Sequence, residues 1–285
     1  NSIVLLLKSL GINDLINFDF MDPPSPDMLI RSLEQLYALG ALNDKGELTK
    51  VGRQMAEFPT DPMLAKTVLA ADKEGCVDEI LSIITMLGEA SSLFYRPKDK
   101  KLQADAARAR FTVREGGDHL TYLNIWTQWV DADFSYVWAR ENFLQQRSLT
   151  RARDVRDQLA KLCDRVEVTL SSSGGSTANT HPILKSLTAG FFPNAARLQR
   201  SGDNYRTVKN NLTVHIHPSS VLGGDAKPKW VIFYELVLTS KEFMRSVMPL
   251  QPEWLTEVAP HYYKAKDVEG LGVGNRREVK QGAKM

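Results

Sequence analysis

The chain has 285 residues, of which 43% are hydrophobic and 25% are charged, and its formal net charge is +2. This length exceeds what one hydrophobic core usually spans, and the composition is that of globular proteins, so two or three domains are expected. The near-neutral charge excludes a uniformly basic surface, and any nucleic-acid interface must therefore be a local basic patch.

The first predicted domain is a small winged helix within residues 1–60. Ser25 provides an N-cap hydroxyl and Pro26 occupies the first helical position, so a helix is expected to begin here. Gly40 can end this helix, Leu48 lies in a short wing strand, and Thr49 can cap a second helix. The apolar residues of the first helix recur at helical spacing: Leu29, Leu33, Leu36 and Tyr37.

The second predicted domain, residues 61–180, is an all-α helical bundle. Asp61 and Asp118 are each expected to cap a helix, and the longest helix is expected to begin near Leu149 or Thr150. The Ser/Gly/Thr-rich stretch 171–179 predicts a flexible surface loop. The longest helix is predicted to bury one apolar stripe: Val155, Leu159, Leu162 and Val166.

The third predicted domain, residues 181–266, is a small β-barrel that follows an initial helix. Residues 213–217 alternate as a strand does, and residues 230–238 form a nearly continuous apolar strand. Glycine-rich turns at 202–203 and 223–225 predict hairpins, which together indicate an OB-fold. Residues 267–285 are predicted to be a flexible tail. Its glycine-rich stretch 270–274 follows no predicted strand, which excludes a dinucleotide-binding loop. The fold class expected is multi-domain α+β.

Neither a metal site nor a membrane segment is predicted. Cys76 and Cys163 lie far apart without C-x-x-C spacing, which favours a reducing compartment and argues against structural zinc. His215 and His217 share a strand face, but no third ligand lies near them in the sequence. The longest apolar run, residues 3–7, is too short to span a bilayer, and no secretory signal is visible.

Three groups of segments carry a family resemblance. They are residues 22–26, 36–42 and 58–62; residues 116–120, 141–143, 147–149 and 152–156; and residues 205–209, 217–220 and 234–239. In this order and spacing, from Phe18 to Tyr263, the chain resembles the region that follows the motor in DEAH-box RNA helicases. Residues 11–18, 241–245 and 258–266 look most like the spliceosomal member that remodels the activated spliceosome before the first transesterification.

The resemblance implies a winged helix, a ratchet (helix-bundle) domain and an OB-fold that enclose single-stranded RNA together with two RecA-like lobes. It also implies a nuclear location, pre-mRNA as ligand, other spliceosome components as partners, and a G-patch protein that bridges the winged helix and the second RecA lobe. The sequence contains no G-x-x-x-x-G-K-[ST] loop and no D-E-A-H run. This chain is therefore expected to bind and position RNA without catalytic residues or a cofactor of its own. ATP and magnesium are expected in motor domains that precede Asn1.

Two sets of residues are candidate RNA ligands. Guanidinium groups suit phosphate oxygens, and four arginines lie at the start of the longest predicted helix: Arg147, Arg151, Arg153 and Arg156. The alternative for these is a solvated face, with Arg153 paired to Asp157. The predicted barrel adds aromatic, basic and hydroxyl groups: Tyr205, Arg206, Lys209, His217, Ser219 and Ser220. The alternative is that Tyr205 packs inside the barrel and the serines only turn the chain.

Met28, Leu29 and Ile30 are candidate partner-binding residues, because three consecutive apolar positions on a helix cannot all face one core. They either pack against a neighbouring domain or form an apolar surface for the helix of a G-patch protein. Two other function classes remain open at this point. One is a winged-helix DNA-binding protein, which the lack of a basic recognition helix disfavours, and the other is a scaffold that binds no nucleic acid.

Overall fold

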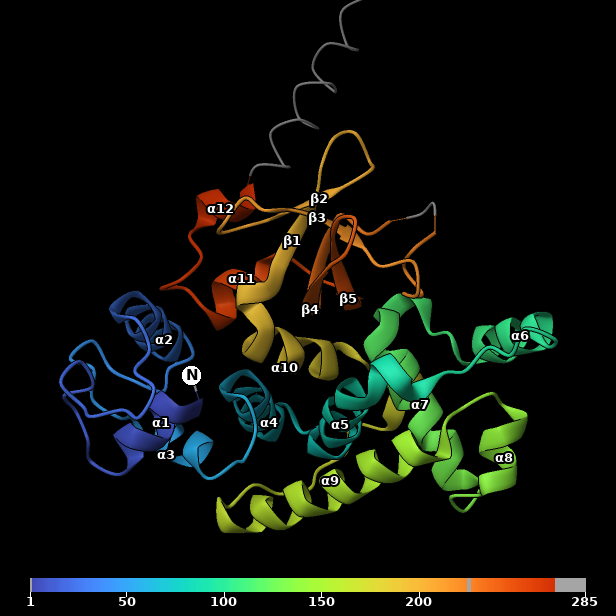
Figure 1. Cartoon of the computed structure of the whole chain (residues 1–285), viewed down its shortest axis with the longest axis horizontal. Helices are drawn as coiled ribbons and strands as arrows, with labels where there is room; N and C mark the ends of the chain where they lie inside the picture. The colour runs from blue at the N-terminus through green and yellow to red at the C-terminus, as the bar shows by residue number, and fades with distance from the viewer. Residues whose placement is uncertain (1, 225–226, 270–285) are drawn as a thin grey trace, which may run out of the picture.

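A computed structural model describes residues 2–224 and 227–269 of the chain. The winged helix lies at one side, the β-barrel stands above a row of helices, and the longest helix runs along the opposite edge (Figure 1). Among the described residues, no helix is both long and apolar enough to cross a membrane. The fold class expected from the sequence is confirmed.

The winged helix is built from α1 (Ser2–Ser9), α2 (Pro26–Ala38) and α3 (Lys50–Ala56). The hydroxyl oxygen of Ser25 accepts a hydrogen bond from the N–H of Met28, and that of Thr49 accepts one from Gly52, so both predicted caps are confirmed. A single bridge between Leu42 and Leu48 forms the wing. Helix α1 was not predicted from the sequence.

The helical bundle contains α4 (Pro62–Glu74), α5 (Val77–Leu93), α6 (Lys101–Phe111), the 3-10 turn η1 (Arg114–Gly116), α7 (Gly117–Asp131), α8 (Tyr136–Glu141) and α9 (Gln146–Arg165). Asp61 caps α4 as predicted, because its carboxylate accepts from the N–H of Met63. Helix α5 packs between α7 and α9 and forms the centre of the bundle.

The predicted stripe of α9 is partly wrong. Its buried face consists of Leu149, Ala152, Leu159 and Cys163, while Val155 is exposed and Val166 lies beyond the last helical residue. The helix begins at Gln146, earlier than expected. The error arose because the half-buried Arg156 lies on the inward face of α9. A prediction that considers only apolar residues does not place an arginine on that face.

The stretch 171–179, predicted to be flexible, is fastened to α5. One carboxylate oxygen of Glu79 accepts hydrogen bonds from the Ser172 hydroxyl at 2.7 Å and from the Ser173 N–H at 2.6 Å. The Ser171 carbonyl accepts a bond from the N–H of Asp78 at 2.8 Å. The stretch includes a 3-10 turn, η2 (Gly175–Thr177). Its polar composition therefore serves to hold a buried glutamate.

Helix α10 (His181–Phe191) leads into the barrel and packs along α4. At Gly190 the helices approach so closely that a Cβ atom would collide with the side chain of Thr67 and the carbonyl of Met63. This contact supports the barrel on the bundle.

The barrel comprises the 3-10 turn η3 (Phe192–Asn194), β1 (Ala195–Leu198), β2 (Tyr205–Thr207), β3 (Thr213–Ile216), β4 (Trp230–Leu238) and β5 (Glu242–Pro249). It closes in the order β1-β2-β3-β5-β4, with β3 and β5 parallel. The hairpin predicted at residues 202–203 is confirmed. That predicted at 223–225 is wrong, because β3 and β4 are not neighbours and the connection crosses over β5.

Two short helices, α11 (Glu253–Val258) and α12 (Ala265–Glu269), follow the barrel. The predicted tail therefore begins in a helix, and its stretch 270–274 lies outside the described residues. Strands β1 and β5 were not predicted, since their sequences show no clear alternation of apolar and polar residues.

Candidate nucleic-acid interface

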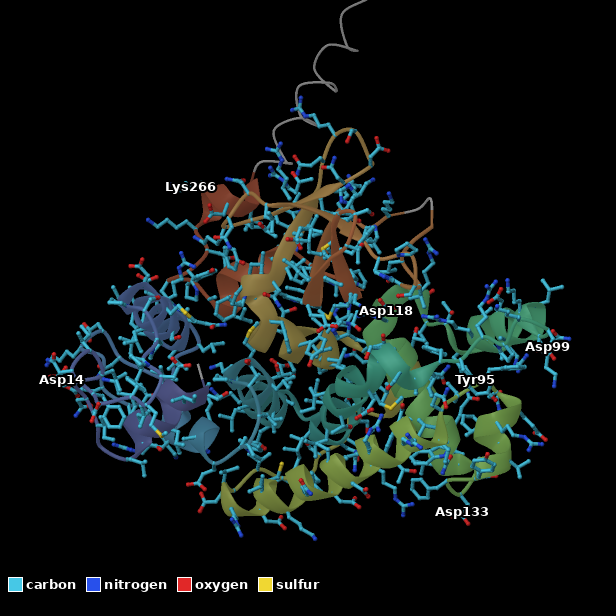
Figure 2. All side chains as sticks on the ribbon, viewed as in Figure 1. Asp14, Tyr95, Asp99, Asp118, Asp133 and Lys266 are labelled. Atoms are coloured by element: carbon cyan, nitrogen blue, oxygen red, sulfur yellow. The ribbon has the colours of Figure 1, made fainter. Side chains whose placement is uncertain are left out.

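Asp118 joins the helical bundle to the barrel and does not cap a helix as predicted. Its carboxylate accepts hydrogen bonds from the Ser220 hydroxyl at 2.5 Å, the Val221 N–H at 3.0 Å and the Val247 N–H at 2.8 Å. The side chain is 3% exposed, at the point where α7 meets the barrel (Figure 2). Burial raises the pKa of Asp118, and the hydrogen bonds oppose that rise. Three barrel donors thus converge on one bundle carboxylate.

Gly117 makes this approach possible. Its φ of +63° is in the region that favours glycine, and a Cβ here would collide with the carbonyl of Val247. The first turn of α7 therefore lies directly against β5, and the loop that follows β3 is held against the same helix.

A cavity of 140 Å³ opens beside this junction, and we call it the seam pocket. Its charged and polar lining comes from the bundle and from the barrel: Ser91, Arg108, Asp118, Tyr122, His217, Ser219, Ser220, Glu235, Arg245 and Ser246. Arg108 donates a hydrogen bond to the Ser219 carbonyl at 2.5 Å, and its guanidinium carbon lies 4.0 Å from the centre of the Phe94 ring. Arg108 is thereby fixed at the pocket wall.

His217 and Arg245 complete the polar wall of the seam pocket. The Nδ1 atom of His217 accepts a hydrogen bond from the Ser219 N–H at 3.1 Å, so the neutral ring carries its hydrogen on Nε2. Burial, with Arg245 and Arg108 nearby, lowers the pKa of His217. Arg245 lies 3.9 Å from a carboxylate oxygen of Glu235, a weak ion pair. The two arginines of the lining are matched in number by the carboxylates of Asp118 and Glu235, of which Asp118 already accepts three hydrogen bonds.

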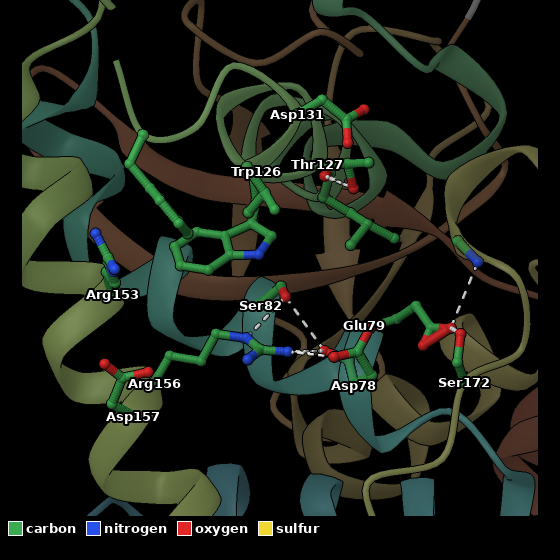
Figure 3. A pocket seen from close by; sticks show the side chains of 14 residues that line it. Asp78, Glu79, Ser82, Trp126, Thr127, Asp131, Arg153, Arg156, Asp157 and Ser172 are labelled. Atoms are coloured by element: carbon green, nitrogen blue, oxygen red, sulfur yellow. Dashed lines mark hydrogen bonds and ion pairs between the residues drawn. The ribbon is translucent and has the colours of Figure 1, made fainter. Parts of the chain in front are cut away.

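Two of the candidate arginines on α9 line a pocket, and of these Arg156 is half-buried while Arg153 is exposed. Arg156 donates to the hydroxyl of Ser82 at 3.0 Å and to the carboxylate of Asp78 at 2.5 Å. Arg153 stacks on the ring of Phe134 at 3.7 Å, where the sequence had suggested a pair with Asp157. Both line a cavity of 400 Å³ between α5, α7, α9 and the 171–179 stretch (Figure 3). The described contacts of Arg156 are those of a structural residue.

The other two arginines lie at the outer start of α9. Arg147 is exposed, and Arg151 forms an ion pair with Glu89 at 3.0 Å. The hydroxyl of Ser148, between them, lies 2.9 Å from that of Ser92 on α5. Since Ala90 and Ser91 of the same helix and Phe94 directly after it line the seam pocket, α5 connects the start of α9 with that pocket.

The candidate residues of the barrel separate into buried and accessible groups. Tyr205 is 1% exposed and donates its hydroxyl to the Pro228 carbonyl at 2.5 Å, so it packs inside the barrel and cannot stack on a base in this fold. Ser220 is committed to Asp118. Arg206 is exposed, and Lys209 lies 4.9 Å from the centre of the Tyr262 ring and 3.6 Å from a carboxylate oxygen of Asp267.

The three partner-binding candidates differ in their exposure to solvent. Leu29 is 6% exposed and packs in the core, while Met28 and Ile30 are 60% and 48% exposed. A helix turns 100° per residue, so its central residue faces inward and its neighbours diverge to either side. Leu29 is therefore unavailable as a docking anchor.

Sequence reasoning missed Arg108, Arg245 and the role of Asp118. Arg108 belongs to a basic run that also holds Lys100, Lys101 and Arg110, which was the one available signal. The partners of Asp118 lie 102 to 129 positions away, beyond any local pattern. Both cysteines are buried and free, and burial raises their pKa values to about 11. Among the described residues, no three His, Cys, Asp or Glu side chains gather as a metal site requires.

Three family models match the chain, in the order of its domains. Residues 32–60 match the winged-helix part of the helicase associated domain (HA2), and residues 61–122 match its ratchet-like part. Residues 183–262 match the oligonucleotide/oligosaccharide-binding (OB)-fold. These three domains are those of the C-terminal module of DEAH/RHA-type helicases. These domains are characteristic of DEAH-box helicases, which are ATP-dependent RNA helicases. In this helicase module, the seam pocket lies where the ratchet-like bundle meets the OB-fold.

Proposed function

We propose that this helicase module forms one wall of an RNA channel in a spliceosomal DEAH-box helicase and docks a G-patch regulator. The observation that carries the RNA-binding part is the seam pocket, where the ratchet and the OB-fold bring Arg108, Arg245, His217 and Ser219 together. These groups are hydrogen-bond donors of the kind that hold phosphate oxygens.

The junction at Asp118 fixes the positions of the residues that line the seam pocket. Asp118 ties the 217–222 loop and β5 to α7, so the donors of both domains keep one relative position. RNA that binds at a preformed site needs to order fewer side chains than RNA that binds at a mobile site. Its binding therefore costs less free energy. RNA would bind here through its backbone, and so without a strong sequence preference. In this proposal, ATP hydrolysis with magnesium belongs to RecA-like lobes that pack against the module.

The partner assignment rests on Met28 and Ile30, which are exposed on either side of the buried Leu29 on α2. An amphipathic helix of a G-patch protein is the proposed occupant, because the apolar face of such a helix can cover an exposed apolar side chain of α2. The nucleus and pre-mRNA follow from the resemblance to the spliceosomal members.

Fluorescence anisotropy with labelled single-stranded RNA and with duplex DNA tests the proposal. Arg108→Glu should weaken RNA binding by roughly tenfold or more, because a charged hydrogen bond contributes about 1.5–3 kcal/mol. Lys101→Glu, on the same helix but outside the seam pocket, is the matched control. Equal affinities for the two variants would reject the seam pocket as the RNA site. Preferential binding of duplex DNA would favour a DNA-binding winged helix, and the absence of binding would favour a scaffold.

A further inference from the structure

The helical bundle holds a buried carboxylate with only one of its oxygens bonded. Glu79 on α5 is 1% exposed, and the four hydrogen bonds that it accepts from the 171–179 stretch all go to its Oε1 atom. Its Oε2 atom has no hydrogen-bond partner, and within the described part of the chain no cation forms an ion pair with Glu79. Buried charges are normally paired, because an unpaired charge is costly to remove from water. The described residues supply no counter-charge to Glu79.

Glu79 lines the cavity of 400 Å³ between α5, α7, α9 and the 171–179 stretch, which we call the bundle pocket. Its volume lies within the range of about 300–1,000 Å³ that is usual for small-molecule sites. Four carboxylates and two arginines line it, which leaves an excess of two negative charges. Arg156 is already paired with Asp78. The bundle pocket therefore attracts cations and repels phosphate groups.

Two of the carboxylates are exposed at other walls of the bundle pocket. Asp131 ends α7 and Asp157 lies on α9, and within the residues that the structure describes neither forms an ion pair. The C-terminus of α7 adds partial negative charge beside Asp131. In Figure 3, Asp131, Asp157 and Glu79 stand apart from one another. No three carboxylates among the described residues gather as a metal ion requires, so an elongated dication matches this wall better than a compact one.

The apolar part of the lining suits an aliphatic chain between two charges. Leu123, Trp126 and Val130 come from successive turns of α7 and line the bundle pocket together. Methylene groups against these side chains would be removed from water. An ammonium group fits better than a guanidinium, because the planar guanidinium fork is matched by both oxygens of one carboxylate and Oε1 of Glu79 already accepts four hydrogen bonds.

We propose that the bundle pocket binds a linear aliphatic diamine. One ammonium group lies beside Glu79 and supplies its counter-charge, and the second lies near Asp131 or Asp157. The inference goes beyond the proposed RNA-binding function, since the ligand is a cation and the bundle pocket shares no residue with the seam pocket.

The experiment follows the indole N–H signal of Trp126 by nuclear magnetic resonance, because this ring lines the bundle pocket. The chain has five tryptophans, and Trp126→Phe identifies the signal. Putrescine, a linear diamine, should shift it saturably. Nα-acetyl-lysinamide carries one ammonium group and should bind roughly twofold to fivefold more weakly, which is the contribution of an exposed ion pair. Magnesium chloride of equal ionic strength should cause no saturable shift.

Three variants locate the binding. Glu79→Gln removes the charge but keeps a carbonyl oxygen that can accept from Ser172 and Ser173, and it should weaken putrescine binding roughly tenfold or more. Asp157→Asn changes an exposed residue, so it should fold as the wild type and bind roughly twofold to fivefold more weakly. Asp154→Asn is the matched control, since it lies exposed on the same helix outside the bundle pocket and should bind as the wild type. Circular dichroism checks the fold of each variant, and Asp157→Asn decides the test if Glu79→Gln does not fold.

Four outcomes would overturn the inference. Wild-type affinity in both Glu79→Gln and Asp157→Asn would place putrescine elsewhere. Equal affinity for Nα-acetyl-lysinamide and putrescine would mean that the bundle pocket takes a single ammonium group, as a lysine side chain of a partner would offer. A saturable shift with magnesium would assign the carboxylates to a metal ion. An unshifted Trp126 signal with putrescine would reject the site, and none of these results depends on whether the module binds RNA.

Discussion

Replacing Asp118 should separate the ratchet-like bundle from the OB-fold. In Asp118→Ala, the N–H groups of Val221 and Val247 lose their acceptor in a buried junction, and so does the Ser220 hydroxyl. An unsatisfied buried donor costs about 1–3 kcal/mol, and the loss of one partner from a buried charged network costs about 3–5 kcal/mol. We therefore expect a loss of about 3–5 kcal/mol for Asp118→Ala. Asp118→Asn, which keeps the shape and one oxygen, should lose about 1–3 kcal/mol.

Calorimetry and hydrogen exchange together test this expectation. At about 2–4 °C per kcal/mol, Asp118→Ala should lower the melting temperature by roughly 10 °C. The amide of Val247 should exchange faster, while amides in the α4–α10 contact should keep their protection. Asp154→Ala, an exposed carboxylate on α9, is the control. A melting temperature within about 2 °C of the wild type, with Val247 still protected, would refute the role assigned to Asp118.

Three further predictions concern single residues. Leu29→Asp should lower the melting temperature sharply, because it buries an unpaired carboxylate in the winged-helix core, whereas Met28→Asp should melt as the wild type and lose only G-patch peptide affinity. Burial lowers the pKa of His119 to about 3, so the unfolded chain takes up a proton that the fold excludes and stability falls as the pH drops below 6.5. In guanidinium unfolding, His119→Leu should therefore lose about 2 kcal/mol less than the wild type between pH 7 and pH 5; an equal loss would contradict this. Arg147→Glu should reduce the salt slope of RNA binding by about 0.7 without changing the melt, and an unchanged slope would mark Arg147 as a surface charge only.

Local sequence determined the features whose physical cause is local. Ser25, Thr49 and Asp61 each cap a helix through a bond to an N–H two or three residues ahead, so the pattern and the contact lie in the same short segment. The alternation of residues 213–216 and the apolar run of β4 likewise identified two barrel strands. The order of the three domains followed from the quoted family segments.

The tertiary structure decided which of these side chains reach solvent and which bind each other. Asp118 looked like a helix cap because its position before an apolar run fits that role, yet its donors come from a barrel more than a hundred residues later. Arg156 and Tyr205 looked like RNA ligands by residue type, but one holds α5 and the other fills the barrel. Residue type and local spacing fix the conformation of a short segment. The partner of a buried polar group depends on how distant segments pack, because its hydrogen bonds must be satisfied wherever the fold places donors.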